Sequence, residues 1–463
     1  DWDDGVSYPG GEKGVTVQFD GQYHFGYITF AQVIEKHDIS GVKVYADDKE
    51  VSGATLVRRK DADNRTFYLV KLPKEGATAQ KLKVNIGCAY GHQNWISIAE
   101  MRFHAYDSLE ADILGLYADD LHTSIREDVT KEMLDELETR LDTKKNGEYH
   151  FERGELLKEL ENARNIFNEQ AEHGDIVKVH PGITEMQDGG KGFSGLNAWQ
   201  PLGVSAMEGE TLIVYVGSNK GKTGDNTDIR LVASQYHAES GKLVSGEIAL
   251  KVGRNEITVP GISSMDVERG GSVYVVYKGN NANDQYAVRV NGGTKIPVLD
   301  LYKATEEERS GRILAYVEEL EKAVPKIEET HKKLKTHSND FDETNCIAGA
   351  TEIMLDQMMY SVSAKQILSG LGSGTAADKA ARLESSLKAM DQMLALYYQH
   401  KGLNDSAPDQ VDKLPAQHLN IRYQRMFAGA FMYAAGNHIG IEWGSVSGLA
   451  SGSALVLNEV GEY

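Results

Sequence analysis

The chain has 463 residues, too many for a single hydrophobic core, and this length predicts about three or four domains. Its 41% hydrophobic and 25% charged content is that of a globular protein and excludes widespread disorder. A formal net charge of −20, without any block of Lys or Arg, argues against binding to nucleic acid or anionic membranes. No apolar run approaches the roughly 18 residues of a membrane-spanning helix, so no membrane span is expected.

Two sequence features bear on compartment and processing. Cys88 and Cys346 are the only cysteines and fall in different predicted domains, which excludes a disulfide framework and leaves one interdomain bridge open. The chain opens at Asp1 without a signal peptide or an initiator Met, so we interpret it as a processed or trimmed chain. The missing signal peptide therefore says little about the compartment in which the protein works.

Residues 1–107 are predicted to form an antiparallel β-sandwich. Turns rich in Gly and Asp separate short β-branched or aromatic runs, and no amphipathic helix lies between them. The expected strands include Val15–Phe19, Gly26–Phe30, Val42–Tyr45, Thr66–Leu72 and Lys81–Ile86.

The opening Trp2-Asp-Asp-Gly5 and the closing segment Trp95–Tyr106 resemble the coagulation factor 5/8 type C (discoidin) fold, shared by galactose-binding carbohydrate modules. The resemblance implies galactose- or N-acetylgalactosamine-type glycans as partners. Sugar binding needs an exposed aromatic ring and polar side chains, and His92, Asn94 and Trp95 are the candidates. A core position for Trp95 remains equally open. In that family the glutamate of the last strand, here Glu100, often helps to hold a structural calcium. The other calcium ligands lie in a loop before Trp2 that this chain lacks, so calcium stays an open possibility.

Residues 108–175 are predicted to be a helical spacer. Apolar residues recur at four-residue steps along Asp128–Leu141, and a second helix is expected over Gly154–Gln170. Residues 176–302 return to short strands divided by Gly, Asn and Asp turns, and they predict a second β-sandwich. The acidic turn Asp225–Asp228 is interpreted as a solvated turn in preference to a calcium site.

Residues 303–463 are predicted to be rich in helix. Thr305 and Glu308 have the spacing of a capping box ahead of an apolar helical stripe. Further helices are expected over about 346–368 and 376–399. The expected fold class is therefore multidomain α+β: two antiparallel β-sandwich domains separated by a helical spacer, followed by an α-rich domain.

The stretch from His418 to Trp443 is the most informative part of the sequence. It places aromatic residues among Gly and Ala, which allow close backbone approach, and it sets His438 and Glu442 beside glycines. A buried strand or helix with one satisfied histidine is the structural alternative. The run R-Y-Q-R-M-F-A-G-A-F-M-Y-A-A-G-N-H-I-G-I-E-W, followed by G-S-V-S-G-L-A-S-G, resembles the segment before the zinc motif of enhancin-like metallopeptidases (peptidase family M, number sixty).

Members of that family are secreted zinc enzymes that cut mucin-type glycoproteins, and their catalytic signature is H-E-x-x-H. None of the 14 histidines here is followed by Glu, and no two lie four apart. The resemblance therefore places the zinc ligands beyond Tyr463, and this chain, without a catalytic residue of its own, is expected to be inactive. Asn437, His438, Glu442 and Trp443 are the candidates for the wall of the substrate cleft.

The sequence thus predicts the front portion of an extracellular bacterial metallopeptidase, secreted or attached to the cell surface. The substrates that the resemblance implies are O-glycosylated, mucin-like proteins, and the expected cofactor of the intact protein is zinc. The alternative is a non-catalytic glycan-binding or adhesin protein built from the same sandwich domains. An H-E-x-x-H motif beyond residue 463 would distinguish the two.

Overall fold

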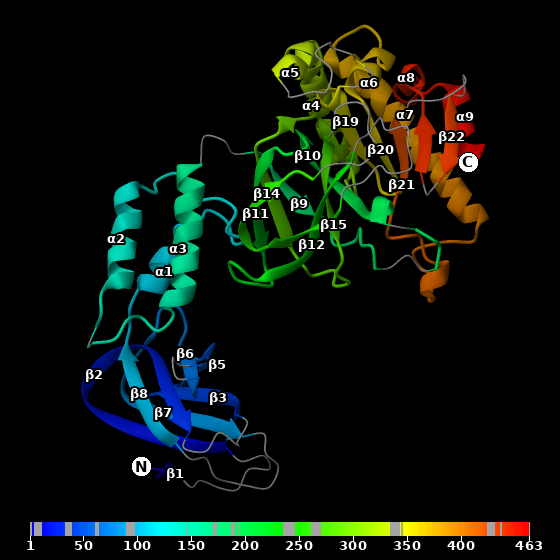
Figure 1. Cartoon of the computed structure of the whole chain (residues 1–463). Helices are drawn as coiled ribbons and strands as arrows, with labels where there is room; N and C mark the ends of the chain where they lie inside the picture. Colours follow the sequence, from blue (N-terminus) through cyan, green and yellow to red (C-terminus); the bar gives the residue numbers. More distant parts are fainter. Residues whose placement is uncertain are drawn as a thin grey trace. The chain divides into compact units, whose positions relative to one another are not determined.

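A computed structural model of the chain describes residues 2–3, 12–32, 39–60, 64–88, 98–145, 147–169, 174–186, 190–193, 195–234, 246–260, 270–333, 343, 346–423, 431–435 and 438–462. The chain folds as two compact units, Asp1–Gly115 and Leu116–Tyr463 (Figure 1). Both contain antiparallel sheets, and the second also carries most of the helices, so the protein is a multidomain α+β protein.

The first unit is built around one antiparallel sheet in the order β4-β3-β7-β2-β6-β5, with β1 and β8 also paired to β2. The elements of the unit are β1 (Trp2–Asp3), β2 (Glu12–Gln32), β3 (Ile39–Ala46), β4 (Lys49–Glu50), β5 (Thr55–Lys60), β6 (Thr66–Lys71), β7 (Ala77–Cys88), β8 (Ile98–Ala105) and the short helix α1 (Leu109–Leu114).

Strand β2 organises this unit. The sequence predicted two strands, Val15–Phe19 and Gly26–Phe30, but both belong to this single strand, whose pairing with β7 shifts register between Gln18 and Tyr23. The shift marks a β-bulge, which bends a strand and lets one strand serve two parts of a sheet. Beyond it, β2 pairs with β6 and β8. The buried core lies between these strands and includes Phe25, Ile28, Phe30, Tyr68, Leu82 and Val84.

The second unit begins with the helices α2 (Lys131–Asp142) and α3 (Arg153–Asn168). A polar cluster joins this helical segment to the sandwich that follows it. Glu159 on α3 accepts the main-chain N–H of Thr223 at 3.3 Å and pairs with Nδ1 of His122 at 2.8 Å. Glu169, directly after α3, pairs with Arg254 at 3.0 Å. The helices are therefore fixed to the sandwich by hydrogen bonds as well as by the chain.

Two antiparallel sheets face one another in the sandwich, in the orders β13-β12-β15-β10-β17 and β14-β11-β16-β9. Their strands are β9 (Ile176–Val179), β10 (Trp199–Met207), β11 (Thr211–Ser218), β12 (Asn226–Ser234), β13 (Ile248–Lys251), β14 (Gly253–Thr258), β15 (Gly270–Tyr277), β16 (Tyr286–Asn291) and β17 (Thr294–Lys295). Alternate residues of both sheets, among them Val214, Leu231, Val275 and Val288, fill the core between them.

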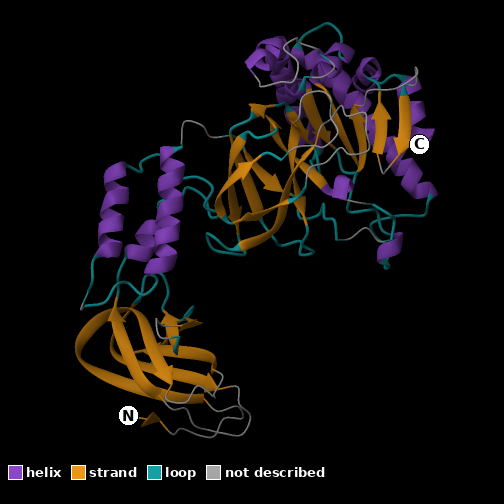
Figure 2. Ribbon diagram, viewed as in Figure 1, coloured by secondary structure: helices purple, strands orange, loops and turns teal. Residues whose placement is uncertain are grey.

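The last part of the chain combines helices with a third sheet of the order β18-β19-β20-β21-β23-β22 (Figure 2). Its strands are β18 (Val298–Asp300), β19 (Ala350–Met354), β20 (Met358–Ser363), β21 (Leu419–Tyr423), β22 (Met432–Ala435) and β23 (His438–Ile441). Its helices are α4 (Glu306–Ala323), α5 (Ile327–Lys333), α6 (Ala364–Gly370), α7 (Ala376–His400), α8 (Ser447–Ser451) and α9 (Ala454–Glu462). The capping box is confirmed, because Glu308 N donates to Thr305 Oγ1 and Thr305 N to the Glu308 carboxylate.

The helix expected over about 346–368 is wrong. This segment forms a short 3-10 turn, the strands β19 and β20, and then α6. Every residue of both strands is buried, so the apolar and polar residues do not alternate as they do in a strand with one wet face. A short buried strand and a buried helix look alike by apolar periodicity alone, and here the sheet partner decides between them.

The two faces of the third sheet have different neighbours. Ile353, Tyr360 and Ile421 pack with the helices, in the same core as Ile313 of α4 and Leu387 of α7. Met354 and Met359 pack with Trp199, Val232 and Tyr274 of the sandwich. Successive side chains of a strand point to opposite faces, so β19 and β20 pack against the helices on one face and against the sandwich on the other. No helix within the described ranges is long and apolar enough to cross a membrane.

Candidate functional site

The segment from His418 to Trp443 supplies the strands at one edge of the third sheet. β21 and β23 are parallel neighbours, and β22 pairs antiparallel with β23 as the edge strand. His438 is the first residue of β23, while Glu442 and Trp443 follow its last residue. Since a strand rises about 3.3 Å per residue, some 13 Å of strand separates His438 from Glu442. The sequence candidates therefore lie at opposite ends of one strand.

The amino end of β23 opens into a pocket of about 940 Å³, which we call the His438 pocket. Its wall is formed by the starts of β20, β21 and β23, the last turns of α7, the loop after α7, the end of α9 and the segment around residue 191. The lining residues include Lys191, Phe193, Met393, Tyr397, Tyr398, His400, Lys401, Leu403, Val411, Asn420, Ala434, His438 and Val460.

All the ionisable Lys, His, Asp and Glu side chains that line this wall are basic. Lys191, His400, Lys401 and His438 line the pocket, and no Asp or Glu is among the described lining residues. Lys401 lies over the ring of Tyr397, with Nζ 5.5 Å from the ring centroid. Lys191 donates to the main-chain oxygen of Gln410 at 3.3 Å. This concentration of bases stands out in a chain of net charge −20.

Two buried polar atoms of the wall have no hydrogen-bond partner among the described residues. Tyr398 is 5% exposed, and its hydroxyl is one of them. Asn420 is fully buried; its amide nitrogen donates to the main-chain oxygen of Leu196 at 3.1 Å, but its Oδ1 is unpartnered. Both atoms are themselves inaccessible to solvent, so they are buried within the wall and their burial carries a desolvation cost.

His438 is half-buried at the mouth of this arrangement. The Nε2 atom of its ring lies 3.3 Å from the hydroxyl of Tyr433, across the β22–β23 pair. The ring of Tyr433 covers Gly440, where an added Cβ would lie 2.2 Å from the tyrosine ring. Glycine at position 440 therefore allows Tyr433 to lie flat across the strand pair and reach His438.

The other two described candidates of this segment, Glu442 and Trp443, do not line the pocket. The Glu442 carboxylate accepts the main-chain N–H of Ser445 at 3.1 Å and so caps the 3-10 turn Trp443–Val446. Trp443 is half-buried against Ile296, Ala350 and Tyr423. Asn437 lies outside the described residues.

The candidate sugar-binding residues of the first unit, His92, Asn94 and Trp95, also lie outside the described residues. Glu100 is described, in β8, and is exposed. Its Oε1 accepts from Nε of Arg102 at 2.6 Å. The carboxylate is thus paired with a cation, and a calcium ion there would have to displace it.

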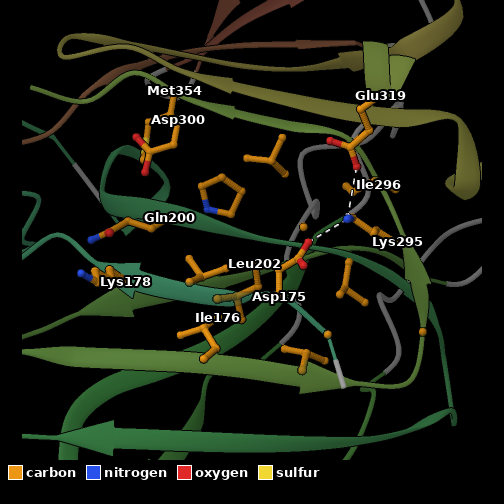
Figure 3. Close-up of a pocket in the computed structure, with 18 of the residues that line it drawn as sticks. Asp175, Ile176, Lys178, Gln200, Leu202, Lys295, Ile296, Asp300, Glu319 and Met354 are labelled. Atoms are coloured by element: carbon orange, nitrogen blue, oxygen red, sulfur yellow. Dashed lines mark ion pairs between the residues drawn. The ribbon is translucent and has the colours of Figure 1, made fainter. Parts of the chain in front are cut away.

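A second pocket, of about 550 Å³, lies where the edges of the three sheets of the second unit meet. Lys295 on β17 points between Asp175 and Glu319 and pairs with them at 2.7 and 3.4 Å (Figure 3). His180 pairs with Asp300 at 2.6 Å. Bases and carboxylates neutralise one another in this pocket, in contrast to the His438 pocket.

A buried polar cluster joins the sandwich to the third sheet; we call it the Glu352 cluster. Tyr274 of β15 donates to Glu352 of β19 at 2.7 Å, and Ser361 of β20 donates to the same carboxylate oxygen at 2.9 Å. Arg422 of β21 donates to Ser234 of β12 at 2.9 Å, and its guanidinium lies 5.4 Å from the ring of Trp199. These contacts tie three strands of one layer to the sandwich.

Burial shifts the titration of two groups in this region. Desolvation raises the pKa of Glu352 to about 7, although the charge of Arg422 and the hydroxyl donors oppose it. Desolvation also lowers the pKa of the fully buried His418 to about 3, against the opposing effect of the Trp199 main chain. The main chain of His418 is held by Asn197, which accepts its N–H at 2.9 Å and donates its side-chain amide to its oxygen at 3.0 Å.

Sequence reasoning missed the Glu352 cluster and most of the His438 pocket. One signal was present: Glu352 is the only charged residue within the otherwise uncharged run Ala350–Met354. A charge inside a buried run implies a partner, but the sequence does not say which one. Tyr398 and Asn420 gave no signal, because the partner that each lacks is visible only in the folded chain.

The described residues do not fit the zinc site of a metallopeptidase. The sequence contains no H-E-x-x-H motif. In the described part of the chain, no three His, Cys, Asp or Glu side chains converge to hold a metal ion. Neither pocket therefore assembles a hydrolytic metal centre from described residues, and no catalytic step is assigned to them.

No protein-family model matches the sequence, and no curated protein matches it significantly. Among solved structures, the fold is similar to a chain with the CBM32-1, CBM32-2 and M60 catalytic domains of ZmpB from Clostridium perfringens. The TM-score is 0.53 at 19% identity, over 95% of this chain and 43% of that chain. This chain therefore spans less than half of that structure, and the likeness at this identity establishes the fold alone.

Two further similar structures have TM-scores below 0.5. The ZmpB metallopeptidase of Clostridium perfringens has a TM-score of 0.44 and 22% identity, over 60% of this chain and 51% of that chain. A metallopeptidase from Bacteroides thetaiotaomicron has a TM-score of 0.41 and 15% identity, over 77% of this chain and 50% of that chain.

Proposed function

We propose that this chain is the front portion of an extracellular bacterial zinc metallopeptidase of the enhancin-like family, which hydrolyses peptide bonds in O-glycosylated, mucin-like proteins. The observation that carries the proposal is the fold similarity to a structure with carbohydrate-binding and M60 catalytic domains, over 95% of this chain. The resemblance of residues 422–443 to the segment before the zinc motif supports the same conclusion. The proposed domains are 1–107, 108–175, 176–302 and 303–463.

The edge strand β22 supports the peptide part of this proposal. Among the described strands it pairs only with β23, so it is the edge strand of the sheet. Such an edge can accept an extended peptide as an additional strand. Ala434 of β22 and His438 of β23 line the His438 pocket, so a side chain or glycan of that peptide could enter it.

The zinc ligands of the intact protein are proposed to lie outside residues 1–463, because the sequence has no H-E-x-x-H motif and the described residues form no metal site. Zinc would supply an activated water and polarise the scissile carbonyl. The part assigned to this chain is binding and orientation of the substrate, with His438 as the side chain most suited to contact it. Asn437, Glu442 and Trp443 are proposed for the more distant parts of the cleft wall.

The first unit is proposed to bind galactose- or N-acetylgalactosamine-type glycans through His92, Asn94 and Trp95, with calcium at Glu100 as an optional structural ion. The test is Trp95→Ala in the whole chain, followed by glycan-array binding and a melting curve. Loss of binding by a folded protein supports the sugar site. Loss of the fold shows that Trp95 is a core residue.

The peptidase proposal is tested on the gene product extended beyond Tyr463. An H-E-x-x-H motif with a downstream glutamate is expected there, with one bound zinc and cleavage of O-glycosylated peptide. Residues 1–463 alone are expected to bind no stoichiometric zinc and to cleave no mucin. An extended product without the motif would instead support the non-catalytic, glycan-binding adhesin.

In the extended protein, His438→Ala is expected to lower kcat/KM for a glycopeptide about tenfold to a thousandfold, equivalent to roughly 1–4 kcal/mol of lost transition-state interaction. Tyr433→Phe is the matched variant, because it keeps the ring over Gly440 but removes the hydroxyl beside His438. A large fall in Tm with unchanged kcat/KM in the folded fraction would show that His438 is only structural.

A further inference from the structure

We infer that the buried polar layer between the sandwich and the third sheet is a pH-controlled latch, closed while the Glu352 carboxyl carries a proton and weakened when that proton is lost. The latch acts on the interface between two parts of the second unit. It requires neither a metal nor a catalytic step, so the inference goes beyond the proposed peptidase function.

The layer consists of two facing rows of polar side chains. On the third sheet, Glu352, Ser361 and Arg422 are register partners on the neighbouring strands β19, β20 and β21. On the sandwich, three serines are aligned in the same way on β10, β15 and β12, namely Ser205, Ser272 and Ser234. All six side chains are buried. A buried charge and its polar neighbours therefore lie across the whole width of the interface.

Hydrogen bonds join the two rows. The Tyr274 hydroxyl of β15 donates to Oε1 of Glu352 at 2.7 Å and lies 2.9 Å from the Ser361 hydroxyl. Arg422 donates to the Ser234 hydroxyl at 2.9 Å. Buried polar groups that lose such partners carry a large desolvation cost, so the state of each member affects closure of the whole layer.

Glu352 is the member of this layer that titrates near neutral pH. Desolvation raises its pKa to about 7, and the charge of Arg422 opposes that shift. Burial raises the pKa of Tyr274, which faces it from β15, and of Tyr316 on α4, so both hydroxyls stay neutral. Desolvation lowers the pKa of His418 to about 3, so this ring is also neutral. Among these groups, Glu352 changes charge between pH 6 and 8.

The neutral and the charged form of Glu352 fit the closed layer differently. Oε1 accepts two hydroxyl donors, whereas Oε2 is inaccessible to solvent and has no partner among the described residues. A carboxylate buried in this way is disfavoured relative to its neutral acid. The folded-state pKa lies above the ordinary value of 4.5, so closure has its full support below pH 4.5 and loses it as the pH rises through 7.

Opening of the layer reaches the His438 pocket through β21. The start of this strand is held by the 3-10 turn Gly195–Ala198. The main-chain N–H of His418 donates to Asn197 at 2.9 Å, and the Asn420 side chain donates to the main-chain oxygen of Leu196 at 3.1 Å. Asn420 also lines the pocket. A weakened latch therefore loosens a strand that forms part of the pocket wall.

The test is hydrogen–deuterium exchange of the whole 463-residue chain at pH 6, 7 and 8, read by mass spectrometry and corrected for the pH dependence of intrinsic exchange. The opening equilibrium of β19, β20 and β21 is expected to rise about fivefold to tenfold from pH 6 to pH 8, because Glu352 loses its proton in this range. The strands β6 and β7 of the first unit are the internal reference and are expected to show no such rise.

Three variants assign the effect. Glu352→Gln keeps the size of the side chain and an acceptor oxygen but cannot ionise, so it is expected to remove the pH dependence. Glu307→Gln, at an exposed carboxylate in the first turn of α4, is the matched control and is expected to retain it. Ser361→Ala removes a donor that lowers the pKa of Glu352, so the midpoint of opening is expected to move to higher pH. A purely structural serine would change the exchange level without moving the midpoint.

The inference is overturned if the third-sheet strands open equally at pH 6 and pH 8, or if Glu352→Gln keeps the wild-type pH dependence. A parallel rise in the first unit would also overturn it, because the effect would then be global. If Glu352→Gln does not fold, the midpoint shift of Ser361→Ala decides. Peptidase activity enters none of these measurements, so they leave the test of the proposed function unaffected.

Discussion

The Glu352 cluster and the His438 pocket lie in the same unit, and both bury polar side chains. They differ in how many hydrogen bonds these buried polar atoms make. In the cluster, Glu352 accepts from Tyr274 and Ser361, which come from different layers of the fold. In the wall of the pocket, the Tyr398 hydroxyl and Asn420 Oδ1 are buried and have no partner among the described residues. Glu352 Oε2 also has no partner among the described residues, but Oε1 accepts two hydroxyl donors from different layers, and these bonds stabilise the fold.

The largest expected effect is on the Glu352 cluster. Glu352→Ala removes the acceptor of two buried hydroxyl donors and leaves a cavity, so it is expected to lower the free energy of unfolding by about 2–4 kcal/mol. Denaturant unfolding measures this change. Glu307→Ala, at an exposed carboxylate in the first turn of α4, is the control and is expected to stay within about 0.5 kcal/mol. Equal effects of the two variants would contradict a stabilising role for the cluster.

The pH dependence of stability reports on the same region. The folded-state pKa of Glu352 is raised from 4.5 to about 7, so the folded protein retains a proton that the unfolded chain has lost. The stability linked to this group is therefore fully present below pH 4.5 and is lost as the pH rises through 7. A loss on the order of 1–3 kcal/mol is expected, and Glu352→Gln is expected to flatten it.

His418 acts in the opposite direction. Its folded-state pKa is lowered from 6.5 to about 3, so the unfolded chain gains a proton first, and stability is lost as the pH falls below 6.5. Urea unfolding across this range separates the two groups, since Glu352→Gln leaves the acid-side loss in place. A stability profile unchanged by Glu352→Gln would show that another group titrates.

Packing, instead of a polar network, holds the β22–β23 wall of the His438 pocket. Gly440→Ala would place a Cβ 2.2 Å from the Tyr433 ring, and relief of this clash is expected to cost about 1–2 kcal/mol. Gly41→Ala in β3 is the matched control, because no atom lies within 4 Å of its added Cβ. If thermal melting shows the same Tm change for both, the Tyr433 ring does not pack on residue 440.

The smallest expected effect is on the free energy of unfolding when one lysine of each pocket is replaced. Lys295→Gln removes pairs to Asp175 and Glu319, but the lysine side chain is 64% exposed, so a loss of only about 0–1 kcal/mol is expected. Lys401→Gln removes no described ion pair and is expected to cost less still. Denaturant unfolding of both variants checks this order, and a larger loss for Lys401→Gln would mean that the lysine has a structural role.

Much of the local structure was predictable. Several strands of the β-rich segments, the helices α2, α3, α4 and α7 and the capping box at Thr305 follow from short-range patterns, namely β-branched runs, four-residue apolar steps and cap spacing, although the two strands expected over 15–30 form the single strand β2. The segment 346–368 was not predictable in this way. Its strands are buried on both faces, so the alternation that would identify a strand is absent.

The sequence by itself determined the order of β and α segments, the acidic charge and the absence of an H-E-x-x-H motif within residues 1–463. Only the tertiary structure decided which residues meet. Glu352 and Tyr274 are 78 positions apart, and the direction of β23 placed His438 and Glu442 at opposite ends of a strand. Local patterns depend on neighbours within a few residues, whereas pockets and buried pairs depend on sheet pairing between distant segments, which no short-range pattern specifies.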